Sequence, residues 1–287
     1  MCTNGIMTIL IHGATGAQGA PVVAAVALSD STVQAAVRDA SAYTGPGVAT
    51  AVDYSSVDSL ENAYRGADAV FVHLPIGPPE LQLAYATAIV EAVRRARPAR
   101  VVMSTSGYGV DVPGNEGNPV DVLARGLRET DVSLAIVAPR LFLENLLLPS
   151  VFGPAREGVL AYPIREDYAV SWSSHLGVAD VAARLLRDNS VTGVVGVGAL
   201  PGLLGTDLAA GFAEHLGRDV RFEAQTPDEF GAGIIPLFGE AAAAPVVDSY
   251  RWRATQPSEL IEESTSAQVR LDIAPRTVTE WLRDLGV

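Results

Sequence analysis

The sequence predicts a protein of the doubly wound α/β class, in which a parallel β-sheet is covered by helices on both faces. In the first half of its 287 residues, short runs of β-branched or apolar residues alternate with longer, Ala-rich segments. This alternation is typical of βαβ units. The short runs are apolar throughout, as expected for parallel strands that are buried on both faces. The order of the segments and the pattern within them therefore predict the same class.

The elements follow from these patterns in order. We expect strands at residues 8–11, 33–37, 49–52, 69–72, 100–103 and 134–137. We expect helices at residues 17–28, 56–64, 79–96, 120–129, 178–187, 206–216 and 277–285. Ser56 supplies a capping start for the second helix, and Pro98 stops the third. Beyond Pro139 the chain is interrupted by Pro149, Pro154 and Pro163, which indicates a smaller α/β lobe in the C-terminal half.

Composition excludes several classes of protein. Hydrophobic residues make up 48% of the chain, so a real core can form and disorder is excluded. The net charge of −13 repels phosphate backbones, and we expect no nucleic-acid partner. The chain has no run of 18 apolar residues and no signal peptide, so we expect a cytoplasmic protein without a membrane span. A single cysteine, Cys2, and no clustered His, Asp or Glu spacing predict no metal site.

A glycine-rich turn follows the first expected strand and opens the first helix. Gly13, Gly16 and Gly19 recur at three-residue intervals. Such glycines permit a tight turn, close approach to a pyrophosphate and close packing of helix on strand, while the helix N-terminus attracts the phosphate. Thr15 stands where the G-x-G-x-x-G fingerprint has its middle glycine. The turn predicts a dinucleotide site; the alternative is a turn that needs only positive φ angles.

The residue after the second strand predicts which dinucleotide binds. Arg38 occupies this position, where an acidic residue would bind the ribose hydroxyl of NAD and an arginine accommodates the 2′-phosphate of NADP. We therefore expect NADP(H), with NADPH preferred over NADH. The alternative is that Arg38 is a solvated charge paired with Asp39.

The segment Gly13-Ala14-Thr15-Gly16-Ala17-Gln18-Gly19 resembles the glycine motif of the short-chain dehydrogenase/reductase superfamily. Looser matches in the order of the NmrA-like branch of that superfamily follow at residues 52–54, 65–71, 139–145, 178–182 and 206–209, so that the resemblance spans about residues 6–230. It implies an NAD(P)-binding Rossmann domain at residues 1–140 and a substrate-binding lobe at residues 141–287, interleaved with the first and not independent of it. The cofactor-binding residues would be Gly13, Thr15, Gly16, Ala17, Gln18, Gly19, Arg38, Asp53, Tyr54, His73, Leu74, Pro75 and Ser104.

The catalytic residues implied by the resemblance are incomplete. The superfamily uses a serine at the end of the fifth strand and a Tyr-x-x-x-Lys pair, but this chain contains no lysine at all. Ser106 stands at the right strand end, and Tyr108 is the nearest phenol to the expected nicotinamide, although it equally fits a loop aromatic that packs under the lobe. Arg125, the only cation in the helix where the lysine would fall, is a poor substitute because guanidinium does not titrate near neutrality.

A site without lysine is compatible with reduction of a quinone, because solvent can protonate the stabilised phenolate that forms. We therefore expect an NADP(H)-dependent oxidoreductase for a small apolar carbonyl or quinone-like molecule. The substrate-binding residues would be Phe142, Asn145, Trp172 and His175, which packing alone would also explain. Two alternatives stay open: a dinucleotide-sensing regulator without chemistry, and a non-redox isomerase or dehydratase. The sequence does not indicate an oligomeric state.

Overall fold

The computed structural model describes residues 6–114 and 116–287, so Cys2 lies outside the described residues. Contacts within the chain divide it into two compact units. The first, called the sheet unit here, comprises Met1–Pro139, His175–Val197 and Ser264–Ile273. The second unit comprises Arg140–Ser174, Gly198–Glu263 and Ala274–Val287. Residues 175–197 and 264–273, which follow the start of the expected lobe in sequence, thus belong to the sheet unit.

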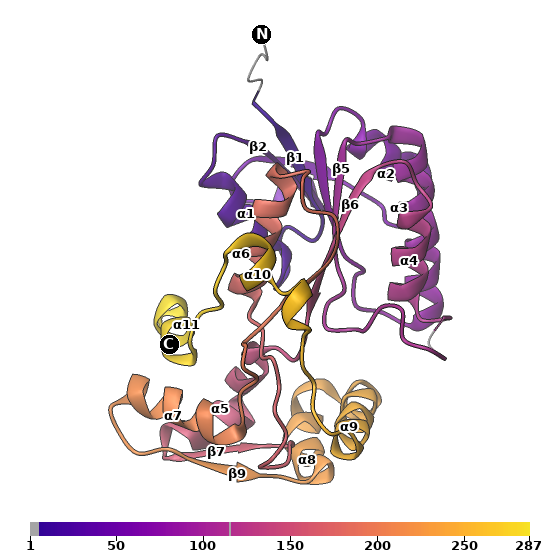
Figure 1. The fold of residues 1–287 in the computed structure, drawn as a ribbon. Helices are drawn as coiled ribbons and strands as arrows, with labels where there is room; N and C mark the ends of the chain where they lie inside the picture. The colour runs from indigo at the N-terminus through magenta and orange to yellow at the C-terminus, as the bar shows by residue number, and fades with distance from the viewer. Residues whose placement is uncertain (1–5, 115) are drawn as a thin grey trace. The chain divides into compact units, whose positions relative to one another are not determined.

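The described residues of the sheet unit form a seven-stranded sheet in the order β3-β2-β1-β4-β5-β6-β8 (Figure 1). All of its strand pairs are parallel. The strands are β1 (Thr8–Ile11), β2 (Thr32–Val37), β3 (Val48–Ala51), β4 (Ala69–Val72), β5 (Arg100–Ser104), β6 (Ser133–Pro139) and β8 (Gly193–Val197). The order reverses between β1 and β4, because the crossovers from β1 lead to β2 and β3 while those from β4 lead to β5 and β6. This is the doubly wound α/β arrangement expected from the sequence.

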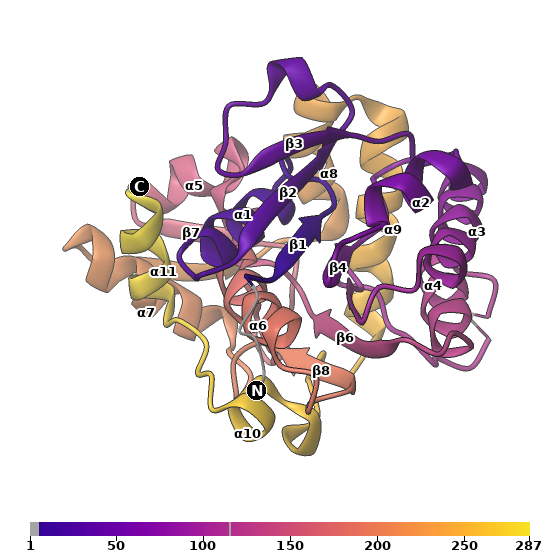
Figure 2. The same ribbon diagram turned by 90° about the horizontal axis from the view of Figure 1, so that it is seen from above.

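Helices cover both faces of this sheet (Figure 2). α1 (Gly19–Ala27) packs against α6 (His175–Arg187) on one face. On the other face α3 (Pro79–Ala96) lies between α2 (Val57–Tyr64) and α4 (Pro119–Arg128). The short elements η1 (Ala40–Ala42) and α10 (Ala267–Leu271) complete the unit. Ser56 caps α2 by accepting the N–H of Ser59, and the left-handed Arg97 ends α3, so the local signals place the helix ends as expected.

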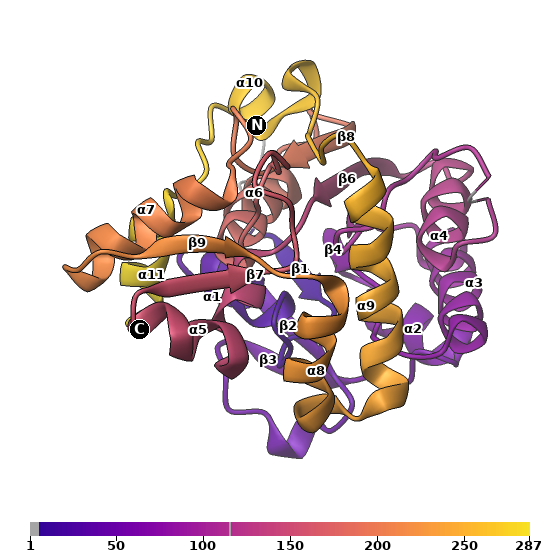
Figure 3. The same cartoon turned by 90° about the horizontal axis from the view of Figure 1, so that it is seen from below.

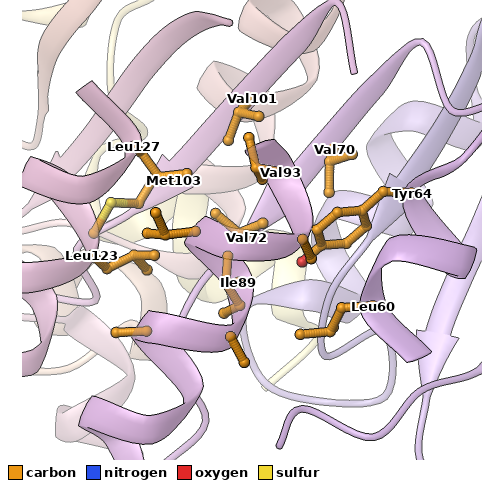
Figure 4. Packing of buried hydrophobic residues seen from close by; sticks show 14 of the residues in the cluster. Leu60, Tyr64, Val70, Val72, Ile89, Val93, Val101, Met103, Leu123 and Leu127 are labelled. Atoms are coloured by element: carbon orange, nitrogen blue, oxygen red, sulfur yellow. The ribbon is translucent and has the colours of Figure 1, made fainter. Parts of the chain in front are cut away.

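The core of the sheet unit fills the space between β4, β5 and the helices α2, α3 and α4 (Figure 4). Side chains of β4 and β5 pack against side chains of the three helices, and the side chains from both sources are buried. They include Leu60, Tyr64, Val70, Val72, Ile89, Val93, Val101, Met103, Leu123 and Leu127. Burial of each aliphatic side chain contributes about 1.5–3 kcal/mol to the stability of the fold. This layer therefore holds β4 and β5 against the three helices.

Arg100 is a buried cation at the first position of β5. Its guanidinium donates to the carbonyls of Leu185 at 2.9 Å and Val191 at 2.6 Å, and to Ser133 Oγ at 2.8 Å. Burial lowers the pKa of Arg100 from its ordinary value, yet three satisfied donors keep it in the sheet. The contacts connect β5 and β6 to the end of α6 and to the segment before β8.

The second unit contains a parallel pair of strands, β7 (Val159–Tyr162) and β9 (Arg221–Ala224), with helices packed on it (Figure 3). α5 (Pro149–Arg156) packs on β7, α7 (Gly205–Leu216) packs on β9, and α8 (Pro227–Phe238) packs on α9 (Glu240–Thr255). The remaining elements of this unit are η2 (Leu143–Leu147) and α11 (Val278–Leu285), and η3 (Glu263–Thr265) lies where the chain returns to the sheet unit. Its core is aromatic: Tyr162 makes edge contacts with Trp172, Phe230 and Tyr250.

Several expectations about elements were wrong. The first helix begins at Gly19 and not at residue 17, because the glycine turn extends through Gln18. The expectations missed the strands β7, β8 and β9 and the helices α5, α8, α9 and α10. Pro149 was expected to break the chain but starts α5, since proline is tolerated in a first helical turn, and Pro154 lies within the same helix. None of the helices in the described residues has the length and apolarity needed to cross a bilayer.

Candidate functional site

The carboxyl ends of β1, β4 and β5 lie side by side at the point where the strand order reverses. In open α/β sheets this point leaves a crevice in which ligands bind. The segments that follow the three strands are the glycine turn after β1, His73 after β4, and the segment Ser104–Ser106 at the end of β5. Residues predicted separately from the sequence are thereby brought to one edge of the sheet.

The glycine turn has a geometry that only glycine allows at two positions. Gly13 has a φ of 59°, and a Cβ there would lie 2.5 Å from Nε2 of His73. A Cβ on Gly19 would lie 2.1 Å from the carbonyl oxygen of Gly13. The turn is closed by a hydrogen bond of 2.7 Å from the N–H of Gly16 to the same oxygen. Glycine is thus required at positions 13 and 19, because a side chain there would collide with His73 or with the backbone of Gly13.

The turn also presents uncommitted backbone donors. The N–H groups of Thr15, Ala17 and Gln18 have no hydrogen-bond partner within the part of the chain that the structure describes. Thr15, Gly16 and Ala17 are exposed, and the turn leads directly into α1, whose N-cap residue Gln18 does not cap the helix with its side chain. Free N–H groups at a helix N-terminus bind phosphate groups. The turn therefore fits the pyrophosphate of a dinucleotide.

The buried Tyr54 supports the glycine turn through a hydrogen bond. Its hydroxyl accepts the N–H of Gly13 at 3.0 Å, and its ring packs on His12 and Tyr85. Burial raises the pKa of Tyr54 to about 12, so it stays a neutral phenol. Asp53, by contrast, is exposed, and its carboxylate accepts the N–H and hydroxyl of Ser55. The two residues, both expected to bind the cofactor, thus differ: Tyr54 is buried against the turn and Asp53 lies at the surface.

Two histidines lie beneath and beside the turn. His12 is fully buried, with Nε2 2.9 Å from the hydroxyl of Tyr64, and burial lowers its pKa to about 3. His73 is partly exposed as a residue, its Nδ1 lies 3.3 Å from the carbonyl oxygen of Leu74, and its Nε2 is shielded from solvent. Burial also lowers the pKa of His73.

Arg38 is exposed after β2 and makes no ion pair with Asp39 in the described structure. The carboxylate of Asp39 instead accepts the N–H of Ser41 at 2.9 Å and its hydroxyl at 2.6 Å, which caps η1. The alternative in which Arg38 is neutralised by its neighbour is therefore not what the structure shows. The guanidinium is left available for an anionic ligand.

The segment at the end of β5 is joined to the glycine turn by side chains. Ser104 Oγ donates to Gln18 Oε1 at 2.8 Å, and Gln18 Nε2 donates to Ser106 Oγ at 2.9 Å. Ser104 is buried, whereas Ser106 is partly exposed. Tyr108 lies two residues further on and is 52% exposed. The structure brings Gln18, Ser104 and Ser106 together and leaves the phenol of Tyr108 largely in solvent.

The segment after β4 is held by a residue that the sequence did not single out. Leu74 is buried, and the carbonyl of Pro75 accepts Nε2 of Gln82 at 2.9 Å from the first turns of α3. Tyr64 hydrogen-bonds His12 beneath the turn, and Gln82 hydrogen-bonds the predicted site residue Pro75, but neither Tyr64 nor Gln82 carries a motif that marks it. Only the register of α2 and α3 on the sheet brings them there.

The residues expected to bind substrate are divided between the two units. Phe142, Asn145 and Trp172 belong to the second unit, and His175 opens α6 in the sheet unit. Trp172 is 2% exposed and packs on Tyr162, and Asn145 hydrogen-bonds Tyr162 and Tyr250 with its side chain. Their binding role stays a prediction. No group of three potential metal ligands occurs among the residues that the structure describes.

Comparisons with known proteins support the fold. The model of the NmrA-like family matches residues 6–282. The prestalk A differentiation protein A of Dictyostelium discoideum is 23% identical over 238 residues, which cover 79% of this chain and 76% of that protein. An NADPH-dependent quinone oxidoreductase from Escherichia coli, solved with NADPH, has a TM-score of 0.77 at 16% identity and covers 98% of this chain and 100% of its own. Triphenylmethane reductase from Citrobacter sp. has a TM-score of 0.77 at 16% identity, covering 99% and 100%.

The sheet order and the glycine turn define the chain as a doubly wound α/β protein with a Rossmann-like fold. Because the family model matches nearly its whole length, the chain belongs to the NmrA-like family. The resemblance inferred from the glycine motif and the order of the later segments is thus confirmed.

Proposed function

We propose that the chain binds NADP(H) at the glycine turn and acts as an oxidoreductase on a small apolar carbonyl or quinone-like molecule. The observation that carries the proposal is the turn itself. Gly13 and Gly19 are sterically required, and the N–H groups of Thr15, Ala17 and Gln18 point to no protein acceptor within the described residues. The quinone oxidoreductase and the triphenylmethane reductase that share the fold support the redox chemistry.

The preference for NADPH rests on Arg38. Its exposed guanidinium follows β2 and makes no ion pair among the described residues, so it is available to a 2′-phosphate. A charge-assisted hydrogen bond contributes about 1.5–3 kcal/mol, which corresponds to roughly a tenfold to hundredfold preference. NADH lacks the 2′-phosphate and would gain none of this.

A bound nicotinamide dinucleotide would supply a hydride. The chain's own residues then have to bind and orient: the turn holds the pyrophosphate, Arg38 holds the 2′-phosphate, and Ser106 offers a hydroxyl near the strand end. No lysine is present to lower the pKa of a tyrosine, and Tyr108 is largely exposed. Quinones suit such a site, because the oxyanion formed on hydride transfer is stabilised and takes its proton from water.

The test combines binding and turnover. Calorimetry with NADPH and NADH on the wild type and on Arg38→Ala measures whether the turn binds and what Arg38 contributes. Arg38→Ala should weaken NADPH tenfold or more, by the loss of about 1.5–3 kcal/mol, and leave NADH nearly unchanged. Loss of nicotinamide absorbance with a panel of quinones then measures turnover. Binding without turnover on any acceptor would favour a dinucleotide-sensing regulator, and no binding of either form would overturn the proposal.

A further inference from the structure

Three side chains form a closed hydrogen-bond ring between the glycine turn and the end of β5. Ser104 Oγ donates to Gln18 Oε1 at 2.8 Å, and Gln18 Nε2 donates to Ser106 Oγ at 2.9 Å. The backbone N–H of Ser106 donates to Ser104 Oγ at 3.2 Å and closes the ring. Each bond lies within one unit of the chain, and the pairs are separated by 86 and 88 residues in sequence.

The direction of these bonds decides what each hydroxyl can still do. Ser104 uses its single proton on the carbonyl oxygen of Gln18 and accepts the N–H of Ser106. The Ser106 hydroxyl oxygen accepts a hydrogen bond from the amide N–H of Gln18, so the hydroxyl proton of Ser106 is not used within the ring. Because Ser106 is partly exposed while Ser104 is buried, the unused donor belongs to the residue that a ligand can reach.

The backbone at Ser106 is shaped to hold this hydroxyl. Ser106 has a φ of 55° and Gly107 a φ of 93°, so a left-handed serine stands two residues after the last residue of β5. A residue other than glycine in this region costs about 1 kcal/mol or more, and it persists where surrounding contacts fix it. The ring supplies two such contacts, one to the side chain and one to the backbone N–H of Ser106.

We propose that Gln18 is a positioning residue that directs the Ser106 hydroxyl, as a hydrogen-bond donor, at the oxygen of the substrate on which negative charge develops. This inference rests on the proposed oxidoreductase function. For a quinone, the carbon skeleton gains a hydride from NADPH, and one oxygen becomes an oxyanion. That oxyanion accepts the hydrogen bond of Ser106 and then a proton from water. The hydrogen added to the ring carbon leaves as a proton to water, the second oxygen takes a proton from water, and hydroquinone and NADP⁺ are formed. Ser106 keeps its own proton throughout.

The amide of Gln18 is essential to this role, because a carboxylate in its place would reverse one bond. In Gln18→Glu both side-chain oxygens are acceptors. The carboxylate therefore accepts a hydrogen bond from the Ser106 hydroxyl, which can then no longer donate to the substrate. Gln18→Glu changes no heavy-atom count in the side chain, which makes it a matched substitution. Protonation of the carboxyl, with an ordinary glutamate pKa of about 4.3, restores a donor on the side of Ser106.

The experiment measures kcat at saturating NADPH and quinone for the wild type, Gln18→Glu, Ser106→Ala and the double variant. Nicotinamide fluorescence measures NADPH affinity separately. Gln18→Glu should lower kcat roughly tenfold to hundredfold at pH 7, a loss similar to that of Ser106→Ala, and its activity relative to wild type should rise as the pH falls toward 5. The double variant should be no slower than Ser106→Ala, because both changes remove the same donor.

Additive losses in the double variant, or a Gln18→Glu enzyme with wild-type kcat, would overturn the positioning role while leaving the proposed function intact. If the wild type binds no NADPH or reduces no quinone, the proposed function itself fails. Should Gln18→Glu not fold, Ser104→Ala serves instead, because it removes the anchor of Gln18 without adding charge. The proposal then requires a several-fold lower kcat at saturating NADPH, and an unchanged kcat would contradict it.

Discussion

His12 makes the stability of the sheet unit depend on pH. Burial lowers its pKa from the ordinary 6.5 to about 3, so the folded protein keeps the imidazole neutral where the unfolded chain protonates it. Above pH 6.5 the residue is neutral in both states and its contribution is fully present. As the pH falls below 6.5, the unfolded state gains a proton that the folded state cannot bind until the pH nears 3. Each pH unit in this range costs about 1.4 kcal/mol, so between pH 6.5 and pH 5 the free energy of unfolding should fall by about 2 kcal/mol.

Urea unfolding at pH 7 and pH 5 measures this effect in the wild type, in His12→Asn and in Tyr64→Phe. Asparagine offers Tyr64 a polar partner but does not titrate, so His12→Asn should lose about 2 kcal/mol of the difference between the two pH values. Tyr64→Phe is the control: it removes the hydroxyl that pairs with His12, and should cost about 1–3 kcal/mol at both pH values while keeping the pH dependence. The reasoning is refuted if His12→Asn responds to pH as the wild type does. His73, whose pKa is also lowered by burial, contributes in the same direction and accounts for a residual slope.

Three further outcomes follow from contacts described above. Gly19→Ala should abolish NADPH binding in calorimetry, because its Cβ would lie 2.1 Å from the carbonyl oxygen of Gly13 and the turn would have to open; retained affinity would show that the turn does not carry the site. Arg100→Met should lower the free energy of unfolding by roughly 2–4 kcal/mol in urea, since it strands the buried carbonyls of Leu185 and Val191, and a change under 1 kcal/mol would contradict this. Trp281→Ala should cost roughly 3–5 kcal/mol by the same measurement, because Trp281 is fully buried and its Nε1 donates to Glu144, whereas Trp281→Phe should cost less.

The sheet could be predicted from sequence where burial on both faces leaves continuous apolar runs. β1 and β4 were predicted with their observed bounds, and β2, β3, β5 and β6 were predicted within one or two residues. β8 was missed because Gly193 and Gly196 interrupt its apolar run, and glycine in such a pattern indicates a turn. Only its pairing with β6 makes this segment a strand. The local sequence pattern therefore predicts a strand where the segment's own residues favour one, and misses a strand that forms only through pairing with a neighbouring strand.

The glycine turn, Arg38 and Ser106 could be predicted from the sequence, because a motif or a position after an expected strand marks each of them. Gly13, Gly19, Arg38 and Ser106 were singled out for this reason. The partners of these residues were not predictable in the same way. The bonds from Gln18 to Ser104 and Ser106 bridge more than 80 residues and depend on how α1 and β5 are placed in three dimensions.

The second unit was the least predictable part. α8 and α9 contain Pro236 and Pro245, which indicate interruption in a sequence but are accommodated within these helices. Its aromatic residues could be taken for a ligand-facing wall, yet Trp172, Tyr162 and Tyr250 are buried against one another. Aromatic side chains serve packing and binding equally well, so composition alone does not separate the two roles.

The way the chain is shared between its two units has a consequence for synthesis. The path passes from one unit to the other after residues 139, 174, 197, 263 and 273. The outermost strand β8, the helix α6 that supplies the backbone acceptor for Arg100, and α10 all emerge from the ribosome after the segments that begin the second unit. A nascent chain released at residue 140 would thus expose an unpaired β6 edge and the parts of β4, β5 and β6 that α6 covers in the whole chain. Neither unit is a contiguous segment of the chain, so neither can be produced by a single truncation.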